Sequence, residues 1–112
     1  RNRRRSDKGE NMTKVICSMA KYNNPLYFEC KGHSDYTNEK TGNNDACVAV
    51  STLCSMLVRY TLLAGHEPQV CEDGHVRIDI EVSDMRTNEV FKAAMLEFSA
   101  LAELFPGHIK VY

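Results

Sequence analysis

The feature that most constrains the fold of this chain is a change in the spacing of its apolar residues. Across residues 75–83, valine and isoleucine alternate with charged side chains, which is the pattern of a strand with one buried face. Across residues 86–104, apolar residues recur at helical spacing, and Pro106 and Gly107 end this segment. The positions on its apolar face are Phe91, Met95, Phe98, Ala102 and Phe105. A strand and a helix of this kind bury their apolar faces against each other.

The other segments carry strand or helix patterns of the same two kinds. Further strands are predicted over residues 12–21, 26–31, 67–71 and 108–112. Another helix, the first in the chain, is predicted over residues 46–63, and its wide apolar stripe predicts that it is well covered. The turn signals Asn23-Asn24-Pro25 and Glu72-Asp73-Gly74 join neighbouring strands into hairpins. The order ββαββαβ predicts a small single α+β domain, with a mixed or antiparallel sheet and two helices packed on it.

Length and charge limit the class of protein. The 112 residues suffice for one domain, placed at residues 12–112. Residues 1–11 carry five basic and two acidic side chains and no apolar run, which predicts a flexible basic tail. The remainder is mildly acidic, so direct nucleic-acid binding is not expected, and no uninterrupted apolar run approaches the roughly 18 residues of a membrane span. Five cysteines without a secretory signal favour reduced thiols and a cytoplasmic location.

Two candidate reactive side chains lie on either side of one polar loop. His33 follows the predicted strand over residues 26–31, and the loop after it contains almost nothing apolar. Asn44 or Asp45 can cap the next helix, and Cys47 falls in its first turn. Unpaired N–H groups and the helix dipole favour a thiolate there, and an imidazolium beside it does the same. A histidine, a loop and a helix-start cysteine are therefore the parts of a cysteine hydrolase site.

The same residue types also fit less specific interpretations. Cys47 can be a core cysteine on one stripe with Val50 and Cys54, and His33 can be a solvated turn residue. Cys30-x-x-His33 has the spacing of half a zinc site, but no second pair completes it, so a zinc site is not expected. The cysteine hydrolase hypothesis needs no metal and no organic cofactor. A redox pair of Cys47 and Cys54 is disfavoured, because residues seven apart on a helix are separated by about 10 Å.

The remaining titratable residues have structural explanations. His75 and His108 lie at predicted element ends, where solvation explains them. The charged face of the strand over residues 75–83 is explained by cross-strand pairing. Cys17 and Cys71 fall in strands and are predicted to be packing residues.

The residues around the loop resemble a known family. Gly32-His33-Ser34, a polar loop with Gly42, and Cys47-Val-Ala-Val-Ser51 are similar to the Gly-His-Ala … Asp-Ile-Val-Cys-Ala-Ala-Val-Ser pattern of the ribosomal-processing cysteine protease (Prp) family. The resemblance covers most of residues 12–112, including the second helix that ends in Phe-Pro before a last strand. The family's Asp three residues before the Cys corresponds to Asn44 here, with Asp45 one residue later.

The resemblance implies a cysteine endopeptidase that removes an N-terminal extension from the twenty-seventh protein of the large ribosomal subunit, cutting after an aromatic residue. Cys47 would then be the nucleophile and His33 the base and later the acid. Asn44, Asp45 and Ser51 are the candidate supporting residues. Either Asn44 or Asp45 is available to support His33, and Ser51 either touches the site or bonds to the helix backbone.

The resemblance also implies a homodimer and a loop that moves when the substrate binds. We expect the substrate to be an extended peptide in a groove roofed by this loop, with Ser34, Asp35, Tyr36 and Gly42 as substrate-loop residues. The alternative is a non-catalytic, ribosome-associated binding module in which Cys47 is a buried thiol.

Overall fold

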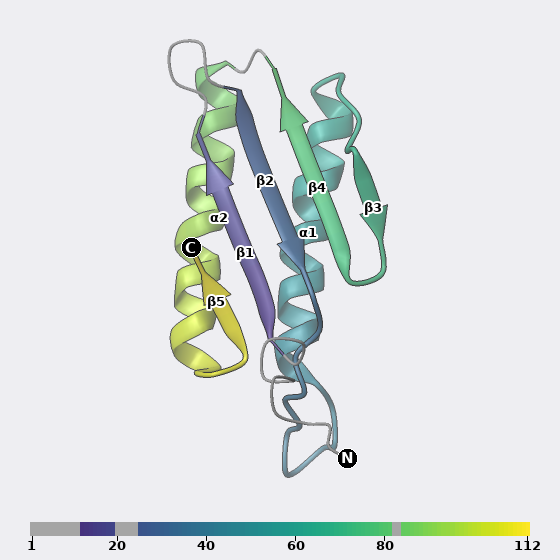
Figure 1. The fold of residues 1–112 in the computed structure, drawn as a ribbon, viewed down its shortest axis with the longest axis vertical. Coiled ribbons are helices and arrows are strands. Elements are labelled where there is room, and N and C mark those ends of the chain that lie inside the picture. The colour runs from purple at the N-terminus through teal and green to yellow at the C-terminus, as the bar shows by residue number, and fades with distance from the viewer. Residues whose placement is uncertain (1–11, 20–24, 82–83) are drawn as a thin grey trace.

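The computed structural model describes residues 12–19, 25–81 and 84–112. Its elements are β1 (Thr13–Ser18), β2 (Leu26–Lys31), α1 (Asp45–Leu63), β3 (Val70–Glu72), β4 (His75–Ile80), α2 (Met85–Leu104) and β5 (Ile109–Val111). The predicted ββαββαβ order and the predicted small α+β domain are confirmed (Figure 1). The predicted tail over residues 1–11 lies outside the described residues.

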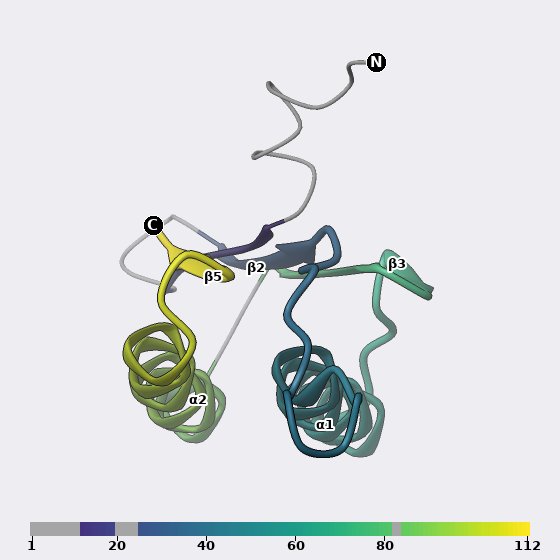
Figure 2. The ribbon, with the colours of Figure 1, turned by 90° about the horizontal axis from the view of Figure 1, so that it is seen from below.

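A five-stranded sheet forms one layer of the molecule, in the order β3-β4-β2-β1-β5. Neighbouring strands are antiparallel except for β1 and β5, which pair in parallel, so the sheet is mixed. Both helices lie on the same face of the sheet, and no helix or strand of the described ranges covers the other face (Figure 2). The sheet therefore has a covered face and an open face.

The covered face carries the hydrophobic core. In β2 the side chains of Leu26, Phe28 and Cys30 are buried, while the alternate residues face the open side. Phe28 packs against Phe91 and Phe98 of α2, with ring centroids 5.9 and 5.8 Å away. Two of the aromatic positions predicted for the second helix therefore form its contact with the sheet.

The predicted and observed elements differ mainly at their ends. β3 begins at Val70, later than predicted, because Pro68 has no N–H to donate to a strand ladder. β1 and β5 are also shorter than predicted, and residues 82–83 of the predicted fourth strand lie outside the described residues. Both helices begin one residue earlier than predicted, with Asn44 and Asp84 as their N-caps.

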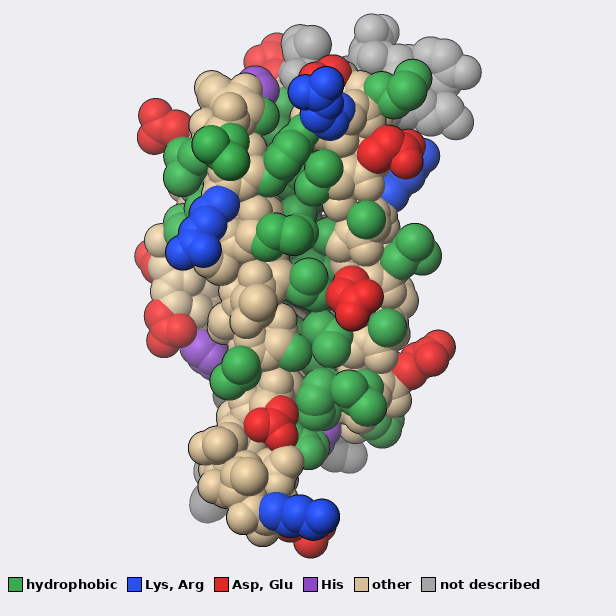
Figure 3. Space-filling model, turned by 180° about the vertical axis from the view of Figure 1, so that it is seen from behind, with side chains coloured by type: hydrophobic (Ala, Val, Ile, Leu, Met, Phe, Trp, Pro, Cys, Tyr) green, Lys and Arg blue, Asp and Glu red, His purple; other side chains and the backbone are tan. Residues whose placement is uncertain are grey.

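The prediction that the first helix is well covered is wrong. The buried residues of α1 form a single stripe on the sheet: Ala46, Val50, Cys54, Leu57 and Thr61. Large apolar side chains of the same helix are exposed: Val48, Met56, Leu62 and Leu63. Figure 3 shows apolar side chains gathered along the helical face of the molecule. By length and composition alone, α1 is apolar enough to cross a membrane. A search for uninterrupted apolar runs does not find it, because polar residues interrupt its sequence. The buried stripe of α1 nevertheless packs on the sheet as a layer of the domain.

Candidate active site

β2 ends in a turn that carries His33. Gly32 adopts φ +100°, in the left-handed region, and a Cβ there would stand 2.6 Å from the backbone oxygen of Met12, so only glycine fits. The N–H of Gly32 donates to the carbonyl of Gly74, in the turn between β3 and β4, at 2.9 Å. The exposed His33 side chain therefore leaves the sheet next to that turn.

The start of α1 positions Cys47. Asn44 Oδ1 accepts from the N–H of Cys47 at 3.0 Å, and Asn44 Nδ2 donates to the carbonyl of Ser34 at 2.9 Å. One side chain therefore ties the beginning of the loop to the first turn of the helix, and of the two predicted caps the structure uses Asn44. Cys47 is half-buried in that turn, where the helix dipole and unpaired N–H groups favour negative charge.

Ser34 contacts the sulfur of Cys47. Its side chain is buried, and its Oγ lies 3.8 Å from Cys47 Sγ and 3.5 Å from Asn44 Oδ1. The same sulfur is 3.9 Å from the Ser34 carbonyl oxygen. When Cys47 is a thiolate, the serine hydroxyl is placed to donate a hydrogen bond to it. Sequence reasoning assigned Ser34 to a substrate loop, whereas the structure places it against the candidate nucleophile.

His33 and Cys47 line the same cavity, which has a volume of about 430 Å³. α1 forms one wall of this cavity, and the β3–β4 hairpin forms another. Ser51 also lines it, one helical turn after Cys47, as the sequence analysis allowed. The apolar side chains in its lining include Val50, Val58, Leu62 and Val76. The cavity thus combines two candidate reactive groups with a largely apolar surface.

The other predicted substrate-loop residues lie away from this cavity. Tyr36 packs against Phe105 and His108, with ring centroids 4.9 and 5.4 Å away, at the corner between α2 and β5. Asp35 pairs with His108 Nδ1 at 3.2 Å, so His108 is not simply solvated. Gly42 closes a turn by donating its N–H to a loop carbonyl. The cavity is therefore bounded by α1 and the β3–β4 hairpin, where a groove roofed by the loop was expected.

Asp45 is occupied by a contact inside the loop. Its Oδ2 accepts from Asn38 Nδ2 at 2.7 Å, while Asn38 Oδ1 accepts from the backbone N–H groups of Lys40 and Thr41. Within the described ranges, no hydrogen bond joins either Asn44 or Asp45 to His33. Both candidates for supporting the imidazole therefore have other roles in this structure: Asn44 caps α1, and Asp45 closes the loop.

The remaining cysteines differ in their environment. Cys30 and Cys54 are buried in the cavity lining, and the thiol of Cys54, with burial, raises the pKa of Cys30. Burial raises the pKa of Cys17 to about 11. Cys71 is exposed on the cavity wall, which corrects the prediction that it is a packing residue. In the described part of the chain, no group of three or more His, Cys, Asp or Glu side chains is placed to hold a metal ion.

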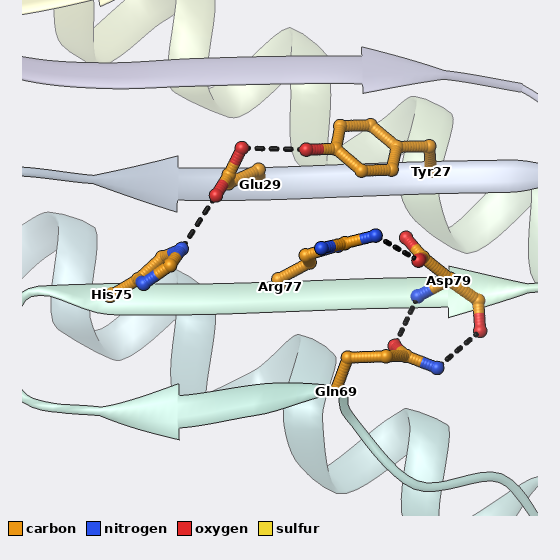
Figure 4. A network of polar contacts seen from close by, with 6 residues as sticks. All are labelled: Tyr27, Glu29, Gln69, His75, Arg77 and Asp79. Atoms are coloured by element: carbon orange, nitrogen blue, oxygen red, sulfur yellow. Dashed lines mark hydrogen bonds and ion pairs between the residues drawn. The ribbon is translucent and has the colours of Figure 1, made fainter.

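The cross-strand pairing predicted for the charged strand over residues 75–83 takes the form of a polar network on the open face, whose partners on β2 the sequence did not identify (Figure 4). Tyr27 Oη donates to Glu29 at 2.6 Å, and His75 Nε2 lies 2.5 Å from the other oxygen of the same carboxylate. Arg77 bonds to Asp79 at 2.8 Å within β4 and covers the Tyr27 ring at 5.5 Å. Tyr27 and His75, by hydrogen bonding, lower the pKa of Glu29. His75, expected to be solvated, is therefore paired.

Comparisons with known proteins bear on the fold. The sequence matches no protein-family model, and no curated protein matches it significantly. Among solved structures, the chain resembles SMU.848 from Streptococcus mutans with a TM-score of 0.69 and 26% identity, over 94% of this chain and 95% of that one.

The chain also resembles the essential ribosomal processing protease Prp from S. aureus. With a substrate peptide, the Prp structure gives a TM-score of 0.66 and 14% identity, over 90% of this chain and 98% of that one. The Prp structure with a covalently linked product peptide gives a TM-score of 0.67 and 14% identity, over 89% of this chain and 97% of that one. The predicted resemblance is confirmed at the level of the fold, which this chain shares with Prp over nearly its full length.

Proposed function

We propose that this protein is a cysteine endopeptidase in which Cys47 is the nucleophile and His33 the general base and acid. The observation that carries the proposal is that these two side chains, from opposite ends of one loop, line a single cavity. The capped start of α1 supports a thiolate on Cys47, and Ser34 Oγ offers it a hydrogen bond.

In the proposed reaction, His33 takes the proton of the Cys47 thiol, and Sγ forms a bond to the carbonyl carbon of the substrate. The carbonyl oxygen becomes an oxyanion, which the N–H groups at the start of α1 stabilise. The C–N bond then breaks, and the leaving amine receives the proton from His33. Water, deprotonated by His33, attacks the resulting thioester and releases the acid product and free Cys47.

The substrate that fits this cavity is an extended peptide with apolar or aromatic side chains. The walls offer apolar contacts from Val50, Val58 and Val76. A second, shallower depression on the outer side of α1 also includes Cys47, together with Val48. A peptide held at the sulfur therefore has a surface to follow in both directions.

The likeness to the S. aureus ribosomal processing protease favours a ribosomal protein precursor as the substrate. Specifically, we propose removal of an N-terminal extension from the twenty-seventh protein of the large subunit, with cleavage after an aromatic residue. A homodimer and a cytoplasmic location belong to the same proposal.

Mass analysis of a precursor incubated with the protein tests this function. We expect a single cut with wild type and no cut with Cys47→Ser or His33→Ala. Cys71→Ser is the matched control, because it changes a thiol on the same cavity without changing the proposed chemistry, and it should cleave normally. Cleavage that persists in Cys47→Ser would contradict the assignment.

Alkylation distinguishes the enzyme from a non-catalytic binding module. Because Cys71 is exposed, the measurement is made in Cys71→Ser protein with iodoacetamide at mildly acidic pH. A catalytic Cys47 reacts much faster than the three remaining cysteines, Cys17, Cys30 and Cys54. Equally slow labelling of all four would favour the binding module.

A further inference from the structure

Gly74, in the turn between β3 and β4, lies beside the imidazole of His33. A Cβ on Gly74 would overlap Nε2 of His33 and stand 3.0 Å from Cε1 and 3.1 Å from Cδ2 of the same ring. The Nε2 edge of the ring therefore occupies the space that a side chain at position 74 would need.

Gly74 is distinguished from the other left-handed glycines by this contact. Gly42, Gly65, Gly74 and Gly107 all have φ between +75° and +92°. A Cβ on Gly42, Gly65 or Gly107 would meet nothing within 4 Å, so a side chain there adds backbone strain alone. At Gly74 the same strain is joined by a collision with His33.

The backbone around Gly74 is fixed to the strand that precedes His33. The Gly74 carbonyl accepts from Gly32 N–H at 2.9 Å, and Lys31 pairs with His75 in the β2–β4 ladder. The His33 ring, in contrast, is exposed and has no hydrogen bond to any residue of the described ranges. A side chain at position 74 will therefore displace the ring and leave the turn in place.

From this geometry we infer that Gly74 is a positioning residue for His33, which sets where the imidazole stands in the cavity. The inference rests on the proposed function, in which His33 serves Cys47. Gly74 touches neither the sulfur nor the substrate in this role. It acts by having no side chain, which leaves room beside the turn for the Nε2 edge of the ring.

The test compares Gly74→Ala with Gly107→Ala. The second change introduces the same type of backbone strain, but its Cβ meets no other atom within 4 Å. For precursor cleavage we expect kcat to fall roughly 100-fold in Gly74→Ala with little change in KM, since small displacements of a catalytic group cost about that much. Gly107→Ala should keep wild-type kcat. Equal kcat in the two variants would overturn the inference.

A second readout needs no substrate. The pH profile of Cys47 alkylation, measured in the Cys71→Ser background, should shift in Gly74→Ala and stay unchanged in Gly107→Ala. If wild type cleaves no precursor but this shift occurs, the proposed function fails and the positioning role stands. If wild type cleaves and the profile does not shift, the positioning role fails alone.

Two further variants keep the test valid if Gly74→Ala folds poorly. Gly74→Asn adds a Cβ with a residue that tolerates the left-handed region, and it should reproduce the loss of kcat. In the His33→Ala background the collision is absent, so Gly74→Ala should lower the thermal midpoint no more than Gly107→Ala does. An extra destabilisation that persists without the imidazole would overturn the inference.

Discussion

The two histidines near the β3–β4 hairpin have different surroundings. On the open face of the sheet, His75 is bonded to Glu29, which also accepts a hydrogen bond from Tyr27. At the cavity, the His33 imidazole has no hydrogen bond to any residue in the described ranges. The first histidine belongs to a network whose polar groups hold one another in place (Figure 4). The second has no such partner, and its Nε2 edge stands beside Gly74. An imidazole that is not tied to neighbouring side chains by hydrogen bonds is free to exchange a proton with a thiol or a leaving amine, and this difference separates a structural imidazole from one suited to proton transfer.

The largest effect is expected from the core of the covered face. Phe28→Ala removes the ring that packs on both Phe91 and Phe98, and we expect a loss of about 3–5 kcal/mol in the free energy of unfolding. Urea denaturation measures it. Ile16→Ala, an exposed change on the open side of β1, is the matched control and should cost far less. Equal losses of unfolding free energy in the two variants would mean that the core does not lie on the covered face.

Next in size is the cap of α1. Asn44→Ala removes the acceptor of the Cys47 N–H and the donor to Ser34, so we expect a loss of about 1 kcal/mol in unfolding free energy, together with slower cleavage. Thermal melting and a cleavage assay measure the two effects. Asn44→Asp keeps a capping oxygen and should retain most of the stability. Unaltered stability in Asn44→Ala would contradict the role of the cap.

An effect confined to reactivity is expected at the sulfur itself. Ser34→Ala removes the hydroxyl 3.8 Å from Cys47 Sγ, and the thiolate loses one donor. We expect roughly fivefold slower alkylation of Cys47 at mildly acidic pH, equivalent to about 1 kcal/mol for one hydrogen bond. Ser51→Ala serves as the comparison, because Ser51 makes no hydrogen bond to the Cys47 sulfur within the described ranges. If the two changes act alike, Ser34 has no special role at the thiolate.

The smallest effect at neutral pH, and the one with a distinct pH signature, belongs to the open face. Because the pKa of Glu29 is lowered in the folded state, its ionised form stabilises the fold at pH values above the ordinary carboxyl range. This contribution is lost as the pH falls through the lowered value. Glu29→Gln should therefore flatten the loss of stability on the acidic side, measured as the melting midpoint against pH. If the melting midpoint falls with decreasing pH equally in Glu29→Gln and wild type, the network does not stabilise the fold.

Periodicity, together with the turn and cap residues, was enough to predict the elements and to place His33 and Cys47 at the two ends of one loop. The apolar face of α2, the alternation in β2 and the cap before Cys47 all depend on residues close in sequence, where spacing determines geometry. The network around Glu29 could not be found this way, because β2 and β4 are not consecutive and their register fixes which charges meet. The position of Tyr36 against the α2–β5 corner is a contact between distant segments for which the sequence carries no local signal.

The loop between the imidazole and the sulfur is fastened near both ends, by Tyr36 on the corner at Phe105 and by Asp45 on Asn38. An insertion or deletion between these two contacts, in residues 39–43, should therefore leave the positions of His33 and Cys47 at the cavity unchanged. This short exposed span is a place where the molecule should accept an inserted reporter while the reacting groups keep their spacing.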